Sequence, residues 1–314
     1  MPASVCLIVN PAAGGGRAGR LLSDVEAALC GHGLDVRTER TRDLPHAREL
    51  ACAAALSGET VVCLSGDGMV GAVADSLREV PDAVLGVLPG GRGNDLARVL
   101  GLGQDPVVAC AVVAAGFTRK LDLGVADGKA FVGIASCGFD SDANRIANEA
   151  PSWLGNLVYA YGALRALAAW RPARFELVLD GQRYTFRGYS VGAANSKAYG
   201  GGMYAAPDAL LDDGLLDIPY CEQISKLRFL TRILPKVFKG THVREPSVHM
   251  LRGRELEIAA DRPFTLYADG DPIAELPTHV RVLPAAVSVL VPADDTGSAA
   301  FGGGTNSEPT TAQR

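Results

Sequence analysis

Three glycine-rich segments carry the first chemical signal in this sequence. They span residues 10–16, 65–68 and 89–95, and each follows an apolar run and precedes a helical pattern. Glycines allow the backbone to approach a phosphate closely, and a helix N-terminus adds free N–H groups and positive potential. A plain strand-to-helix turn capped by Asp or Asn would look similar at any one of them. Three in succession favour a phosphate-binding site.

Charged side chains lie in or beyond these turns. Asp67 stands between two glycines, where a metal beside phosphates would need an oxygen ligand, and the planar fork of Arg92 suits phosphate oxygens. Further along, Asp122 lies at the expected domain junction, and Asp269 and Asp271 project from one tight turn. The alternatives are a surface carboxylate at Asp122, a solvated Arg92, and an ordinary Asp–Gly hairpin.

Two other segments carry patterned charge. The acidic turn 212–217 could hold a hard cation through one carboxylate and nearby carbonyls, or be a plain turn. Residues 226–254 contain eight basic side chains and one acid, Glu245, beside apolar residues at helical spacing. This second pattern fits either a solvated amphipathic helix or a surface that docks on anionic lipid.

The elements around these residues change character along the chain. Up to about residue 122, strand-like segments at 4–9, 34–39, 60–64 and 83–88 alternate with helical patterns, which predicts a parallel α/β sheet. Ligands in such sheets bind beyond the carboxyl ends of the strands, where the glycine-rich turns fall. Short alternating runs then predict an antiparallel β-sandwich. They are residues 129–136, 174–180, 183–193, 215–220, 255–259, 264–268, 278–283 and 286–291, interrupted by helices at 153–170 and 225–239.

Composition limits the classes of function. The chain has 314 residues and a net charge of −5, which argues against a nucleic-acid partner. Its seven widely spaced cysteines, without a Cys-x-x-Cys pair, predict reduced and mostly buried thiols in a cytoplasmic protein. No apolar run approaches the ~18 residues of a membrane span, so a lipid substrate would be met by peripheral association during turnover. The polar segment 293–314 is predicted to be a disordered tail.

Taken together, the motifs resemble the diacylglycerol kinase catalytic-domain family, particularly the bacterial lipid kinases, over residues 4 to 292. The matching landmarks follow the family order: Asn10-Pro11-Ala12-Ala13-Gly14, Ser65-Gly66-Asp67-Gly68-Met69, Pro89-Gly90-Gly91-Arg92-Gly93-Asn94-Asp95, Asp122-Leu123-Gly124, Gly200-Gly201-Gly202 to Pro207, Asp213-Gly214 and Asp269-Gly270-Asp271. The resemblance implies a nucleotide-binding α/β domain (1–122), a β-sandwich lipid-acceptor domain (123–284), and a final strand (285–292) that returns to the first.

The resemblance also implies roles for individual residues. Asp269 would be the general base, with Asp122 and Asp67 in a magnesium network. A structural magnesium ion would be bound by Asp213 and the carbonyls of Leu210 and Leu215. The implied ATP site comprises Asn10, Gly14, Thr41, Ser65, Gly66, Asp67, Gly68, Met69, Val70, Gly71, Gly91, Arg92, Asn94 and Asp95.

Several positions depart from the family pattern. Ser65 replaces a glycine, Met69 a threonine that could touch phosphate, and Arg92 a threonine before Gly-Asn-Asp. Ala13 replaces a serine, and Asp271 replaces a glutamate. We therefore expect Arg92 to hold phosphate oxygens in a bidentate manner in place of the lost hydroxyls.

These features predict an ATP- and Mg²⁺-dependent lipid kinase acting on diacylglycerol or a related lipid at a membrane surface. Two alternatives stay open: a kinase of a soluble substrate, as in the NAD kinases, or a weakly catalytic nucleotide- or lipid-binding regulator. The acceptor lipid is not specified by the sequence. An exposed strand edge in the second domain could form a homodimer.

Overall fold

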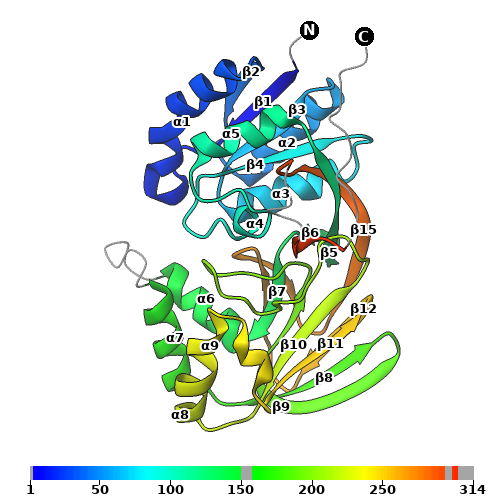
Figure 1. The fold of residues 1–314 in the computed structure, drawn as a ribbon. Helices are drawn as coiled ribbons and strands as arrows, with labels where there is room; N and C mark the ends of the chain where they lie inside the picture. The colour runs from blue at the N-terminus through cyan, green and yellow to red at the C-terminus, as the bar shows by residue number, and fades with distance from the viewer. Residues whose placement is uncertain (1–2, 150–157, 294–298, 303–314) are drawn as a thin grey trace.

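The computed structural model describes residues 3–149, 158–293 and 299–302. Its first part alternates strands and helices, as the sequence predicts (Figure 1). The elements are β1 (Ser4–Val9), α1 (Ala13–Gly31), β2 (Asp35–Arg40), α2 (Leu44–Leu56), β3 (Thr60–Ser65), α3 (Asp67–Leu77), β4 (Val84–Pro89), α4 (Asp95–Val99) and α5 (Pro106–Ala115).

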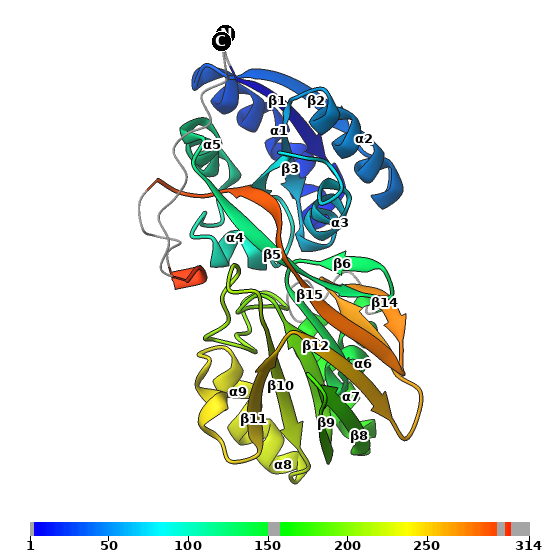
Figure 2. The same cartoon turned by 90° about the vertical axis from the view of Figure 1, so that its right-hand side faces the viewer.

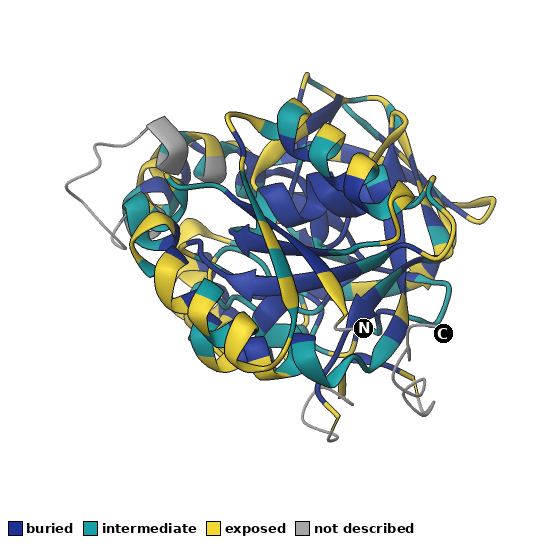
Figure 3. Ribbon diagram, turned by 90° about the horizontal axis from the view of Figure 1, so that it is seen from above, coloured by how far each residue is buried: buried dark blue, intermediate teal, exposed yellow. Residues whose placement is uncertain are grey.

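The N-terminal sheet is parallel and covered on both faces. Its strands pair in the order β2–β1–β3–β4. Helix α1 packs beside α5, and α2 packs beside α3. Figure 3 shows the central strands buried between helices whose outer surfaces are exposed. Burial on both sides explains why β1, β3 and β4 are nearly continuous apolar runs instead of alternating ones.

The C-terminal part consists of antiparallel strands with helices beside them. Its elements are β5 (Thr118–Ala126), β6 (Lys129–Phe131), β7 (Ile134–Gly138), α6 (Phe139–Glu149), α7 (Val158–Ala169), β8 (Ala173–Leu179), β9 (Gln182–Ala194), β10 (Leu216–Glu222), α8 (Lys226–Arg228), a π-helical turn η2 (Phe229–Ile233), α9 (Leu234–Val237), a 3₁₀ turn η3 (Thr241–Arg244), β11 (Val248–Gly253), β12 (Glu255–Ala260), β13 (Thr265–Ala268), β14 (Asp271–Glu275) and β15 (Thr278–Leu290). The predicted fold class, a parallel α/β domain followed by an antiparallel β domain, is confirmed.

Two long strands, β5 and β15, join the domains (Figure 2). Strand β15 begins against β12, runs antiparallel to β5 and ends parallel to β4. The register of β15 with β5 shifts between Leu283 and Val287. The end of the last strand, at Ser288 and Val289, therefore pairs with β4 of the N-terminal sheet.

Local differences from the predicted elements have identifiable causes. The strand predicted at 129–136 breaks between β6 and β7, because the N–H groups of Val132 and Gly133 turn to a side chain described below. The prediction for 225–239 splits into three short helical pieces, whereas α5, β5, α6, β11 and β14 were not predicted. Residues 153–157 of the helix predicted at 153–170 lie outside the described residues, and α7 accounts for the remainder.

The predicted disordered tail is wrong at residues 299–302. Phe301 is buried in the N-terminal core, 4.4 Å below the guanidinium of Arg119. The polar composition of the segment as a whole predicted disorder, although its single aromatic residue packs into the core. Residues 294–298 and 303–314 lie outside the described part of the chain.

Candidate functional site

The three glycine-rich turns meet at one end of the parallel sheet. A Cβ on Gly14 would lie 2.5 Å from the carbonyl oxygen of Gly90, and one on Gly91 would lie 2.4 Å from Cα of Gly66. Side chains at these two positions would therefore force the turns apart. The close backbone contact brings the sequence-predicted residues of the three turns into one place.

Main-chain hydrogen bonds fix the second turn against the third. The N–H groups of Gly90 and Gly91 donate to the carbonyl of Ser65 at 2.8 and 3.1 Å. Asn94 adopts a left-handed conformation (φ 51°), accepts from the N–H of Gly91 at 2.7 Å and donates to its carbonyl at 3.1 Å. Asn is one of the few residues that tolerate this conformation. Ser65, Gly91 and Asn94 thus shape the site.

Helix α3 offers its N-terminus to this site. Its N-cap, Gly66, has no side chain to cap the first turn, so the N–H groups of Asp67, Gly68 and Met69 lack intrahelical acceptors. Such a terminus binds anions. The side chain of Met69 is buried in the core, so only its backbone could serve a phosphate.

Two carboxylates connect the turns and leave one buried oxygen without a hydrogen bond. Asp67 accepts from the N–H of Leu96 at 3.1 Å, and Asp95 accepts from the N–H of Gly201 at 2.8 Å. Oδ1 of Asp95 is buried without a hydrogen bond, and its nearest cation is Arg98 at 3.9 Å. Burial, with Asp67 adding, raises the pKa of Asp95 to about 6. A buried oxygen beside a second carboxylate suits a cation.

The hairpin between β13 and β14 brings Asp269 to the same helix. Its two carboxylate oxygens accept from the N–H groups of Val132 and Gly133, both at 2.9 Å. A Cβ on Gly71 would lie 2.6 Å from Oδ2 of Asp269. Burial chiefly raises the pKa of Asp269 to about 7; the two N–H groups oppose the rise, and Asp67 and Asp271 add to it. Asp269 therefore lies at the first turns of α3.

Asp122 belongs to a different group of acids. Its two carboxylate oxygens accept from the N–H groups of Gly214 and Ala285, both at 2.7 Å. Burial raises its pKa, and the neighbouring acids that add to this are Asp213 and Asp212. The predicted grouping of Asp122 with Asp67 in one magnesium network is not seen in these contacts. Asp122 instead fixes the 211–214 loop to β15 through these two hydrogen bonds.

The residues at the predicted structural metal site do not fit an ion as they are placed. Asp213 forms a 2.7 Å ion pair with Arg252 and accepts from the N–H of Leu215 at 3.0 Å. The carboxylate that would bind magnesium with the carbonyls of Leu210 and Leu215 therefore already has a cation. In the part of the chain that the structure describes, no group of three or more His, Cys, Asp or Glu side chains is placed to hold a metal.

The remaining predicted ATP residues lie on or beside the first and third turns, or in helix α3. Asn10 accepts from the N–H of Ala12 at 3.1 Å, and the hydroxyl of Thr41 donates to the carbonyl of Asp43 at 2.7 Å. Val70 is buried in helix α3. Arg92 is exposed at the third turn, and its contact with phosphate stays a prediction.

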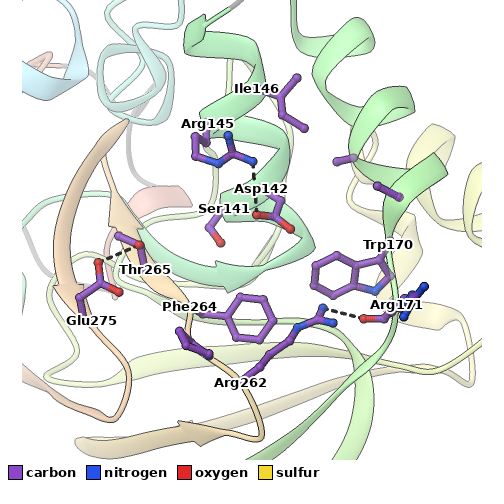
Figure 4. Close-up of a pocket in the computed structure, with 13 residues that line it drawn as sticks. Ser141, Asp142, Arg145, Ile146, Trp170, Arg171, Arg262, Phe264, Thr265 and Glu275 are labelled. Carbon is purple, nitrogen blue, oxygen red and sulfur yellow. Dashed lines mark hydrogen bonds and ion pairs between the residues drawn. The ribbon is translucent and has the colours of Figure 1, made fainter.

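A separate cavity of about 360 Å³ lies in the C-terminal domain (Figure 4). Trp170 and Phe264 line it, and the guanidinium of Arg262 lies 4.9 Å from both rings. Thr265 and Glu275, joined by a 2.8 Å hydrogen bond, form the base of the hairpin whose turn carries Asp269. No sequence motif marked this cavity, because its residues come from four separated segments.

Comparison with known proteins agrees with this architecture. Residues 4–126 match the family model of the diacylglycerol kinase catalytic domain, and residues 133–291 match that of the YegS C-terminal NAD kinase beta sandwich-like domain. A diacylglycerol kinase of Mycobacterium tuberculosis (strain ATCC 25618 / H37Rv) is 35% identical, covering 92% of this chain and 95% of its own. A Klebsiella pneumoniae (strain 342) protein named "Probable lipid kinase YegS-like" is 30% identical, covering 93% and 97%.

The chain therefore belongs to the diacylglycerol kinase and YegS-like lipid kinase family. A crystal structure of a diacylglycerol kinase from Bacillus anthracis str. Sterne has the same fold, with a TM-score of 0.73, 21% identity, and coverage of 92% of this chain and 97% of that one. Within the described ranges, no helix is long and apolar enough to cross a membrane. All seven cysteines are free, and five are buried, as predicted.

Proposed function

We propose that this protein is an ATP- and Mg²⁺-dependent kinase that transfers the γ-phosphoryl group to a lipid hydroxyl, with diacylglycerol as the first acceptor to test. The observation that carries the proposal is the position of Asp269. The β13–β14 hairpin of one domain holds this carboxylate against the first turns of α3 in the other. A base and a phosphate-binding helix terminus are thus brought together.

The N-terminal domain supplies the phosphate site in this proposal. The N–H groups at the start of α3 and the three adjoining turns would hold the phosphates of ATP. Magnesium usually needs only one or two carboxylates, with waters and substrate phosphates completing its shell. Asp67 and Oδ1 of Asp95, which accepts no hydrogen bond and has its nearest cation, Arg98, 3.9 Å away, fit that donor set. The bound ion would neutralise charge on the phosphate oxygens.

Asp269 is the proposed proton acceptor. The lipid oxygen would form a bond to the γ-phosphorus, the bond to the bridging oxygen of ADP would break, and the hydroxyl proton would pass to Asp269. The N–H groups of Val132 and Gly133 fix the orientation of the carboxylate. A pKa near 7 makes this carboxylate a better base than an ordinary aspartate near neutral pH.

The C-terminal cavity supports a lipid acceptor. Along the hairpin, Asp269 lies four positions after Thr265, a span of about 13 Å in an extended strand. A molecule with its hydroxyl at Asp269 could therefore place an apolar part against Trp170 and Phe264. The relative from Mycobacterium tuberculosis that is named diacylglycerol kinase makes diacylglycerol the first choice among such lipids.

The test is transfer of radiolabelled phosphate from ATP into the organic phase with mixed vesicles containing diacylglycerol. Asp269→Asn should lower transfer by at least about 100-fold, the lower range of a general base's contribution, and should still bind ATP. The matched control is Asp180→Asn, since Asp180 also precedes a glycine in a hairpin and accepts from two backbone N–H groups. The control should stay active.

Other outcomes would reject parts of the proposal. Full activity in Asp269→Asn would remove this residue as the base. Transfer to a soluble acceptor that does not depend on vesicles would indicate an NAD kinase-like activity. ATP binding without transfer to any acceptor would indicate a nucleotide-binding regulator.

A further inference from the structure

The segment 226–239, which contains α8, η2 and α9, has an inner face that belongs to the core. Phe229, Ile233 and Val237 are buried, and the ring of Phe229 stacks on Tyr189 with centroids 4.2 Å apart. Phe229 also meets Phe139 edge-on at 4.9 Å. The segment is therefore firmly anchored, and its outward side chains are held in place by these inward ones.

The outer face of the same segment exposes large apolar side chains. Leu227 is 70% exposed, Phe238 57% and Leu230 36%. Leu164 on α7 is 54% exposed, and the ammonium of Lys226 joins the two elements by donating to the carbonyl of Ala168 at 2.8 Å. Four of the seven large hydrophobic residues found exposed in the described chain thus lie on α7 and this segment. Grouped exposure of this kind marks an interaction surface.

Basic side chains lie on the same segment as these apolar side chains. Lys226, Arg228, Arg232 and Lys239 are exposed, whereas Lys236 is paired with Glu245. Residues 226–244 contain no Asp or Glu, although the whole chain carries a net charge of −5. The surface is therefore strongly basic on an otherwise acidic protein.

We propose that the outward residues of 226–239, together with Leu164, form a docking surface for a bilayer that contains anionic lipid. Apolar side chains that enter the headgroup region and cations that meet acidic headgroups are the two features of interfacial helices. A symmetric contact with a second copy is disfavoured, because a two-fold interface would oppose the same four cations.

A single loop links the docking surface to the candidate site. The carbonyl of Val237 accepts from the N–H of Tyr204 at 2.9 Å. Tyr204 continues the glycine-rich loop whose Gly201 donates to Asp95. A bilayer bound at α8–α9 would therefore lie one loop away from the phosphate-binding turns. The inference deepens the proposed function by naming the surface that brings the site to its lipid.

The test measures co-sedimentation of the full chain with vesicles, without ATP. One set contains phosphatidylcholine alone, and the other contains phosphatidylcholine with phosphatidylglycerol. Wild type should bind the anionic set in a salt-dependent manner. One cation near an anionic surface contributes about fivefold to partitioning, so Arg228→Gln/Arg232→Gln/Lys239→Gln should bind about 100-fold more weakly. Leu227→Ser/Phe238→Ser should also bind more weakly.

A control with the same charge change separates this surface from net charge. Arg183, Arg254 and Arg281 are exposed on other parts of the C-terminal domain, so Arg183→Gln/Arg254→Gln/Arg281→Gln should bind like wild type. Equal binding by the two triple variants would overturn the proposal. So would a wild-type dimer that the Leu227→Ser/Phe238→Ser variant abolishes, because the patch would then be a protein interface. Transfer to lipid in detergent micelles reports the kinase activity independently, so the two proposals can fail separately.

Discussion

Two hairpins of this protein share sequence and local geometry but differ in surroundings. The Asp–Gly pairs at 180–181 and 269–270 both place the aspartate in a left-handed conformation, with φ 47° and 52°. Each carboxylate accepts from two consecutive N–H groups, of residues 254 and 255 in one case and of residues 132 and 133 in the other. Local hydrogen bonding alone does not distinguish them.

The surroundings do distinguish them. Asp180 is exposed and closes the β8–β9 hairpin onto the start of β12. Asp269 faces Gly68 and Gly71 of the other domain, with Asp67 close enough to raise its pKa further. The same type of turn thus holds two strands together in one place and carries a candidate general base in the other. What gives Asp269 its proposed role is the helix that it meets.

Among the tests of this comparison, the largest effect is expected from Gly71→Ala, which separates Asp269 from that helix. The added methyl would lie 2.6 Å from Oδ2 of Asp269, so the carboxylate must move. A displacement of about 1 Å in an active site can cost about 100-fold in rate. We therefore expect kcat/KM for lipid phosphorylation to fall by about that factor, measured with labelled ATP.

Gly31→Ala is the matched control for this substitution. Gly31 is the last residue of α1, and a Cβ there has nothing within 4 Å. This variant should keep its activity. Full activity in Gly71→Ala would show that the close contact between Asp269 and α3 is unimportant for transfer.

Much of this architecture could be predicted because the signals are local. Strand-to-helix alternation, three glycine-rich turns and the Asp–Gly pair at 269–270 are patterns within a few residues. The position of Asp269 beside the turns at 65–71 and 89–95 came from the family resemblance. Hairpin chemistry would have given the pair at 180–181 the same description.

The missed features depend on contacts between distant segments. The break in the strand predicted at 129–136 arises because Asp269 captures two of its N–H groups. Arg252, 39 residues from Asp213, occupies the predicted metal ligand. Phe301 is buried against the N-terminal core and under Arg119. In each case the deciding partner is far away in the sequence, and a local pattern contains no information about it.

A smaller effect is expected on the pH dependence. If Asp269 is the base, it must be ionised, so kcat/KM should fall as the pH drops through about 7. An ordinary aspartate would place this limb near 3.9. Asp271→Asn removes a negative neighbour that raises the pKa of Asp269, so the limb should move to lower pH.

Asp127→Asn is the control for this shift. Asp127 also precedes a glycine in a left-handed turn but is exposed on another hairpin. The limb should stay in place in this variant. A limb that lies near 4 in the wild type, or that moves equally in both variants, would contradict the assignment of the limb to Asp269.

The smallest expected effect is a difference in the free energy of unfolding between variants of Asp180 and Asp269. Asp180→Asn loses one acceptor for two N–H groups, which should lower the free energy of unfolding by about 1 kcal/mol in urea titrations. Asp269→Asn loses an acceptor in the same way, but it also removes the free-energy cost of burying an ionised carboxylate in the folded protein. Because burial raises the folded-state pKa of Asp269 to about 7, its contribution to stability falls as the pH rises from the unfolded value near 4 to about 7.

That cost is fully present at pH 8 and much reduced at pH 5, where folded Asp269 is protonated. Asp269→Asn should therefore destabilise less than Asp180→Asn at pH 8, and the gap between the two variants should narrow at pH 5. Catalytic residues commonly reduce the stability of the folded protein, whereas residues that stabilise a turn increase it. Equal losses for both variants at both pH values would mean that the Asp269 carboxylate is held as an ordinary turn acceptor, and that its burial does not raise its pKa.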